Sequence, residues 1–144
     1  MPLIAITRLR IRGWRFMPAF ALQSVRTFMQ ARRAPGNLAT DALNDAHRTF
    51  WTRTAWIDEA AMRDYMRSAP HGPVMRRLAE WCDEASVAHW AQESAEPPDW
   101  REVHRRMQQD GRPSRVLHPT DAHTAFRIPE PRLGQKTKGR SSSP

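Results

Sequence analysis

The chain has 144 residues, with 23 Lys and Arg against 15 Asp and Glu and a formal net charge of +8. This length suits one domain, with or without a tail. The single cysteine, Cys82, excludes an intrachain disulfide, and no stretch approaches the roughly 20 apolar residues that a membrane span needs. The N-terminal apolar run is too short and too interrupted by arginine for a signal peptide, so we expect a cytoplasmic protein.

The basic excess lies mostly in the last third of the chain. Residues 1–96 carry 13 basic and 10 acidic side chains, whereas residues 97–144 carry 10 and 5. A basic tail attracts polyanions without specificity, so we expect no specific nucleic-acid partner, and general polyanion binding stays an alternative role. The sequence "EPPDW" predicts a boundary between a domain at 1–96 and an extension at 97–144, which combines a short helix with a mobile basic tail rich in Pro, Ser and Arg.

The first elements are a strand and a helix. Residues 3–11 end in an alternation of apolar and arginine side chains, which predicts a strand with one wet face. Residues 14–33 carry an apolar stripe at helical spacing, and Pro18 suits the first turn of a helix that begins near Met17. The turn residues at 34–37 end that helix.

Residues 37–47 are ambiguous between helix and strand. Propensity favours a helix with Asn37 as N-cap, while an alternating reading makes a strand. Residues 48–57 are a much stronger strand, rich in Thr and Trp, and need a partner. The segment directly before them is the nearest available partner, which favours the strand.

The second half repeats the helix-then-strand order. Asp58 is a credible N-cap for a helix over 58–68, and the turn at 69–73 interrupts it. A second helical piece follows at 73–85, and a final strand at 86–93.

The order strand, helix, strand, strand, helix, strand predicts an α+β, ferredoxin-like βαββαβ fold with an antiparallel sheet and helices on one face. The other face of the sheet still carries apolar side chains. A second copy of the chain is the economical cover, so we expect a homodimer.

Two passages resemble a known family: "RTFWTRTAWIDEAAMRDYMRSAPH" at 48–71 and "ARRAPGNLATDALND" at 31–45. They are similar to the antibiotic biosynthesis monooxygenase-like proteins of the dimeric α+β barrel superfamily, and the helix–"APG"–strand passage also resembles the spheroidene monooxygenase-related group. The resemblance covers roughly residues 3–93. It implies a dimeric α+β barrel and a range of chemistries that includes cofactor-free oxygenases and haem-degrading enzymes.

The resemblance also implies a pocket between the sheet and the helices. It places Trp56, Tyr65 and His71 there, with Tyr65 and His71 as catalytic candidates. His71 can act as a base because imidazole titrates near neutrality, and Tyr65 can orient a substrate oxygen. Trp56, Met62 and Arg8 are the candidates for substrate binding.

Haem-degrading relatives have a Trp where Tyr65 stands and an Asn near the position of Arg8, so the resemblance favours chemistry without a cofactor and leaves haem as an alternative.

Each candidate also has a structural alternative. Trp51 and Trp56 differ by five positions and therefore face opposite sides of a strand. The resemblance implies that Trp56 faces the helices and that Trp51 lies in the barrel interior, toward the dimer partner. Core packing can explain Trp56 and Tyr65, and a surface or intersubunit ion pair can explain Arg8.

Three possible metal ligands, His118, Asp121 and His123, lie in the expected tail without fixed geometry, so no metal site is predicted. Taken together, the sequence predicts a small cofactor-independent monooxygenase-like protein acting on a planar, electron-rich organic molecule. The alternative is a non-catalytic dimeric barrel that binds a small apolar ligand or haem.

Overall fold

The computed structural model describes residues 1–68 and 71–132, and of residues 71–73 it describes the backbone alone. The first part of the chain forms β1 (Leu3–Ile11), η1 (Trp14–Phe16), α1 (Met17–Arg33), β2 (Asn37–Asp45), β3 (Thr49–Trp56), α2 (Glu59–Arg67), α3 (His71–Trp81) and β4 (Cys82–Ala91). The extension adds α4 (Trp100–Asp110), β5 (Arg112–Pro113) and α5 (Asp121–Thr124). The α+β, ferredoxin-like fold expected from the sequence is confirmed.

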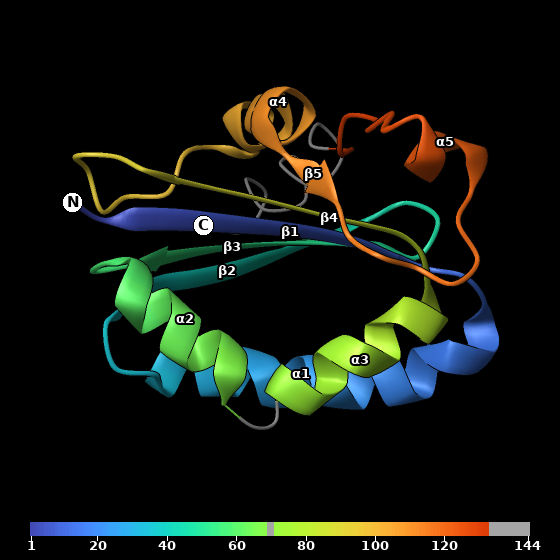
Figure 1. Cartoon of the computed structure of the whole chain (residues 1–144), viewed down its shortest axis with the longest axis horizontal. Coiled ribbons are helices and arrows are strands. Elements are labelled where there is room, and N and C mark those ends of the chain that lie inside the picture. The colour runs from blue at the N-terminus through green and yellow to red at the C-terminus, as the bar shows by residue number, and fades with distance from the viewer. Residues whose placement is uncertain (69–70, 133–144) are drawn as a thin grey trace, which may run out of the picture.

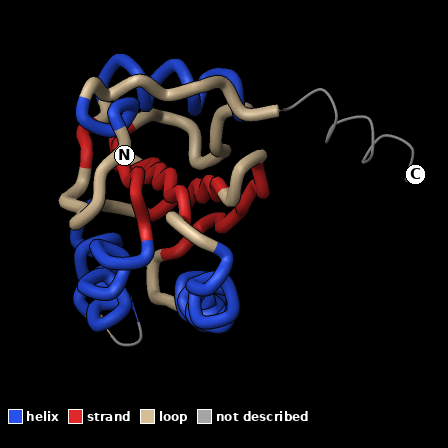
Figure 2. The backbone as a smooth tube through the Cα atoms, turned by 90° about the vertical axis from the view of Figure 1, so that its right-hand side faces the viewer, coloured by secondary structure: helices blue, strands red, loops and turns tan. Residues whose placement is uncertain are grey.

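The strands form one open, antiparallel sheet in the order β2-β3-β1-β4-β5. Helices α1, α2 and α3 lie along one face, while α4 and α5 lie on the other (Figures 1 and 2). The molecule therefore has three layers, and the sheet is the middle one. None of the described helices is long and apolar enough to cross a membrane.

Of residues 37–47, which the sequence left ambiguous, Asn37–Asp45 form the strand β2. The turn before them and their pairing with β3 both favour the extended conformation. Gly36 has a φ of +83°, and its carbonyl accepts a hydrogen bond from the Ile57 amide at 2.8 Å. A Cβ at this glycine would lie 2.6 Å from the Cβ of Ala61, so only glycine fits here without a shift. β2 then pairs with β3 over almost its whole length.

The boundary between α3 and β4 differs from the expected one. The sequence pattern extends the helix to residue 85, whereas the helix ends at Trp81 and β4 begins at Cys82. Glu84 lies opposite Arg10 of β1 in the sheet, and its side chain binds Arg8. These long-range pairings place Asp83 and Glu84 on a strand. Contacts between residues so far apart in the chain produce no local sequence pattern that would predict the strand.

The second face of the sheet is covered by the chain itself. One buried core joins Trp51 and other sheet residues to Trp100, Val103 and Met107 of α4. Helix α4 thus covers apolar residues of the face for which a second copy was expected, and the homodimer itself stays a prediction (Figure 1). No closed barrel is formed.

Much of the expected mobile tail also packs on the domain. The Ser114 amide donates to the Ala85 carbonyl at 2.9 Å, and the Ile128 amide donates to Oε1 of Gln108 at 3.0 Å. Residues 112–132 thus lie along the sheet and α4 rather than free of them. The rest of the expected tail, residues 133–144, lies outside the described residues.

Candidate functional site

A cavity of about 730 Å³ lies between the sheet and the helical layer formed by α1, α2 and α3. Its floor consists of the helix-facing positions of the strands, and its roof consists of side chains from the helices. The strands contribute Thr7, Leu9, Thr40, Ala42, Phe50, Thr52, Thr54 and Trp56, and the helices contribute Met17, Phe20, Ser24, Phe28, Met62, Tyr65, Val74 and Leu78. Aromatic and aliphatic groups dominate, as is usual for sites that bind small organic molecules.

Trp56, Met62 and Tyr65 come together at one end of this cavity. Trp56 is fully buried, and its ring stacks on Tyr65 with centroids 5.1 Å apart and an interplanar angle of 29°. Its indole Nε1 donates to Oγ1 of Thr54 at 2.8 Å, which fixes the ring orientation. Met62 is buried in the same cluster. Trp56 therefore lies on the helix side of β3, as the family resemblance predicts.

Tyr65 is held as a neutral phenol between α1 and α2. Its hydroxyl donates to the carbonyl of Thr27 at 3.2 Å, and burial raises its pKa to about 12. A phenol with this pKa stays protonated near neutrality, so it can donate a hydrogen bond but cannot act as a base.

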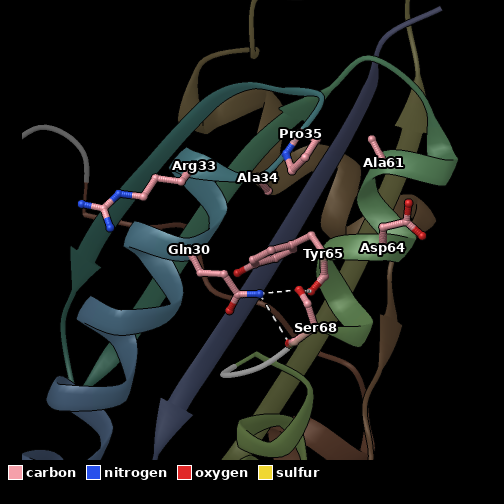
Figure 3. Close-up of a pocket in the computed structure, with 8 residues that line it drawn as sticks. All are labelled: Gln30, Arg33, Ala34, Pro35, Ala61, Asp64, Tyr65 and Ser68. Carbon is pink, nitrogen blue, oxygen red and sulfur yellow. Dashed lines mark hydrogen bonds between the residues drawn. The ribbon is translucent and has the colours of Figure 1, made fainter.

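Tyr65 also borders a second, outer hollow of about 490 Å³ (Figure 3). Figure 3 shows its ring reaching from α2 toward Gln30 of α1. Nε2 of Gln30 donates to Oγ of Ser68 at 2.5 Å, and this bond joins the two helices beside the tyrosine. Tyr65 is therefore part of the wall that separates the cavity from the surface.

Arg8 does not lie in the cavity, which corrects the expectation that it binds substrate. Alternate residues of a strand face opposite sides, and the cavity side of β1 is taken by Thr7 and Leu9. Arg8 is buried on the other face, where its Nη1 donates to Oε1 of Glu84 at 2.8 Å and its guanidinium lies 5.8 Å from the Trp51 ring. Arg8 therefore forms a buried ion pair within one chain, and not the surface or intersubunit pair expected as the alternative.

The pKa of Glu84 reflects this environment. Burial alone would raise it, but hydrogen bonds from Thr120 and Arg8, together with the charges of Arg8 and Arg10, outweigh burial and lower the pKa. Glu84 is therefore a carboxylate at neutral pH.

Three of the six histidines bear on the candidate site or on metal binding. His71 is the first residue of α3, and its side chain lies outside the described residues, so its role stays a prediction. His89 on β4 is the one histidine among the described residues that line the cavity. His123 accepts a hydrogen bond from the Ala85 amide at 3.3 Å, and the described part of the chain has no group of three ligands placed to hold a metal ion.

Two threonines on the cavity floor were not singled out from the sequence. Thr7 and Thr52 lie directly opposite each other on β1 and β3, and neither hydroxyl is hydrogen-bonded to another described residue. The neighbouring Thr54 and Thr40 hydroxyls instead accept bonds from Trp56 and from Asn37. Strand alternation could have identified the pair, but threonine in a strand is ordinarily interpreted as a strand former alone.

Comparisons with known proteins support the fold. No protein-family model and no curated protein matches the sequence. A Nitrosomonas europaea protein described as a candidate antibiotic biosynthesis monooxygenase superposes with a TM-score of 0.56 at 18% identity, over 63% of this chain and 89% of that chain. A Mycobacterium tuberculosis protein superposes with a TM-score of 0.59 at 14% identity, over 65% of this chain and 97% of the other.

A third similar structure is a variant of SnoaB, a cofactor-independent oxygenase from Streptomyces nogalater. It superposes with a TM-score of 0.52 at 18% identity, over 67% of this chain and 98% of that chain. The shared part is close to the whole of each neighbour but only about two thirds of this chain. The chain thus has the fold of the antibiotic biosynthesis monooxygenase-like proteins, as its resemblance to them predicts.

Proposed function

We propose that the chain is a small cofactor-independent monooxygenase-like protein, which binds a planar, electron-rich organic molecule in the cavity between sheet and helices. The observation that carries this proposal is the cavity itself, with the Trp56–Tyr65 stack at one end and a floor of threonines. Its volume of about 730 Å³ falls within the range of sites for small organic ligands. The similar fold of a cofactor-independent oxygenase supports the same reaction class.

The reaction needs a base and a substrate that can reduce O₂ directly. In the proposed mechanism His71 removes a proton from an acidic C–H or O–H group, and the resulting anion attacks O₂. A CH₂ group becomes a carbonyl, one oxygen atom enters the product and the other leaves as water. All the electrons come from the substrate, so the step needs no further reductant.

The other candidates position the ring. Trp56 and Met62 supply flat and adaptable apolar contacts. Tyr65, a neutral phenol whose proton is donated to the Thr27 carbonyl, can orient a substrate hydroxyl by accepting a hydrogen bond from it. The His71 and Tyr65 roles come from the resemblance, and the packing of Trp56 against Tyr65 supports the second of them.

Oxygen uptake with anthrone tests the proposal, since anthrone is planar and carries an acidic CH₂ that oxidises to a carbonyl. We expect equal amounts of O₂ consumed and anthraquinone formed, and a loss of about 100-fold or more in rate for His71→Ala. His118→Ala, an exposed histidine of the extension, is the matched control and should leave the rate unchanged. Full turnover by His71→Ala would remove its proposed role.

A non-catalytic carrier is the second candidate, and the largely apolar lining of the cavity favours it. Haem is one ligand in this class. It needs an axial ligand, and His89 is the imidazole that the described lining residues offer. An absorption spectrum after haem addition separates the cases, since a Soret band favours haem, and a colourless protein with no anthrone turnover favours another apolar ligand.

A further inference from the structure

The floor of the cavity carries two hydrogen-bonding groups in apolar surroundings. Thr7 and Thr52 are direct cross-strand partners, which places their Cβ atoms roughly 4.5–5.5 Å apart. Both line the cavity, and neither hydroxyl has a partner among the described residues. A ligand oxygen above the pair could bond to both hydroxyls.

The pair lies between two aromatic ends. Trp56 is four residues along β3 from Thr52, a distance of roughly 13 Å at strand rise, and Phe50 is two residues away in the other direction. Phe50 packs on Phe20 with ring centroids 4.9 Å apart. An elongated ring system can therefore contact aromatic groups toward both ends while its polar edge meets the threonines.

The lack of a cation beside the threonine pair favours neutral ligands over anions. Two arginines line the cavity away from the pair: Arg63 of α2, which pairs with Glu59, and the exposed Arg112 of β5, which lies two strands from Thr7. Arg8 and Arg53 lie on the opposite face, so no cation of the sheet is a direct neighbour of the threonine pair on the cavity face. Burying a carboxylate or phosphate without a partner costs far more than burying a neutral oxygen. Each threonine hydroxyl both donates and accepts, so the pair suits a phenol or a ketone equally.

We propose that Thr7 and Thr52 form the oxygen-binding pair of the cavity and that they select neutral hydroxyarenes or aryl ketones. This inference rests on the proposed function, since it assigns the polar contact within the same cavity. Both residues are positioning residues for the ligand, and no proton transfer is assigned to them.

The test measures the binding of 2-naphthol and of naphthalene by ligand-observed NMR. The double variant Thr7→Val/Thr52→Val keeps the side-chain shape and removes the hydroxyls. We expect about tenfold weaker binding of 2-naphthol and unchanged binding of naphthalene, because two hydrogen bonds are lost. Thr7→Ser/Thr52→Ser is the matched control and should restore binding of 2-naphthol.

The outcomes separate this inference from the proposed function. Unchanged 2-naphthol binding in the valine variant overturns the oxygen-binding pair and leaves the cavity as the binding site, provided that Ala42→Phe, which fills the floor, abolishes binding. If the unaltered chain binds neither probe, the pair and the proposed cavity site both fall. The valine variant should unfold at the same temperature or higher, because the hydroxyls that it removes have no partner among the described residues.

A second, independent observation concerns the extension. Trp100, Val103 and Met107 of α4 are buried against the sheet face that carries Trp51. Polar contacts fix the start of the extension, since Nη1 of Arg53 donates to the Pro98 carbonyl at 2.6 Å and its guanidinium lies 4.3 Å from the Trp100 ring.

The later part of the extension is held as well. Oγ1 of Thr120 donates to Oε2 of Glu84 at 2.7 Å, and its amide donates to the Asp83 carbonyl at 3.1 Å. His104 of α4 bonds the Ile128 carbonyl through Nε2 at 2.7 Å, which ties α4 to the residues that follow α5. The extension is therefore attached to the rest of the chain at both its start and its later part.

We infer that the extension replaces a second copy of the chain, so that two copies do not pair through this face of the sheet. Light scattering after size exclusion should give the monomer mass of 16.7 kDa, and hydrogen exchange should show protected α4 amides at all protein concentrations. Val103→Asp/Met107→Asp should release α4 and raise binding of an apolar dye. Arg101→Asp/Gln109→Asp, at exposed positions of the same helix, is the control. A dimer that forms as α4 loses protection would overturn the inference.

Discussion

The ring of Trp56 stacks on Tyr65 with centroids 5.1 Å apart, and this contact joins the end of β3 to α2. Tyr65 is the only tyrosine of the chain, so its ionisation can be followed alone by absorbance near 295 nm. Burial raises its pKa to about 12, and we expect the titration midpoint there in the folded protein.

The same shift predicts a change in stability. The folded pKa lies above the ordinary value of 10.0, so the favourable contribution is fully present below about pH 10 and is lost as pH rises toward about 12. A midpoint near pH 10 in a protein that circular dichroism shows to be folded would contradict the buried phenol.

Substitutions of Tyr65 separate its ring from its hydroxyl. Tyr65→Phe keeps the stack and removes the bond to the Thr27 carbonyl, so we expect a loss of about 1 kcal/mol in the free energy of unfolding. Tyr65→Ala also removes the ring and should cost about 3 kcal/mol. Urea titration measures both. Equal losses for the two variants would show that the stack contributes nothing.

Cys82 should be an unreactive thiol in the folded protein. It is fully buried at the start of β4, and burial, with a further contribution from the charge of Asp83, raises its pKa to about 12. Thiolate is the reactive form, so a disulfide reagent should modify this single cysteine at the rate of unfolding. Rapid modification of the folded chain at pH 8 would contradict this burial.

Local patterns predicted most of the fold. Alternation in residues 48–57 placed Trp51 and Trp56 on opposite faces, because side-chain direction in a strand depends on parity, and the family resemblance assigned Trp56 to the helix side. The N-cap role of Asp58 is equally local, and its side chain accepts a bond from the Ala61 amide at 2.9 Å. The early start of β4 was missed, because the ion pair that stabilises it joins residues 76 positions apart.

The site was predicted less completely than the fold. The resemblance grouped Trp56 with Tyr65, which do meet, whereas Arg8, chosen because a strand arginine can bind an anionic substrate, lies on the face of β1 away from the cavity. The role of α4 was missed for a different reason. Its apolar stripe at Trp100, Val103 and Met107 indicates a buried face, but a local stripe does not specify the surface that it covers.

Gly36→Ala should destabilise the protein by at least about 1 kcal/mol. The residue has a φ of +83°, and the new methyl group would meet Cβ of Ala61 at 2.6 Å and Cγ1 of Ile57 at 2.9 Å. Both strain and crowding act at the turn that starts β2. Gly13→Ala is the matched control, since a Cβ there would meet nothing closer than 3.9 Å. Equal stability of the two variants would contradict the tight turn.

The buried pair of Arg8 and Glu84 should stabilise the fold without contributing to ligand binding. Removing one partner by Glu84→Gln leaves the arginine buried and uncompensated, so we expect a loss of about 3–5 kcal/mol, while Arg8→Met/Glu84→Leu should lie much closer to the unaltered chain. The pKa of Glu84 is lowered, so its contribution is present above the ordinary glutamate range and is lost as pH falls through the lower, folded value.

Binding of 2-naphthol provides the second measurement on this pair. Arg8 lies across the sheet from the cavity, so the folded double variant should bind the probe as the unaltered chain does. Weaker binding in a fully folded Arg8→Met/Glu84→Leu variant would restore Arg8 as a substrate-binding residue. It would also contradict the separation of the two sheet faces, because Arg8 does not line the cavity in the structure.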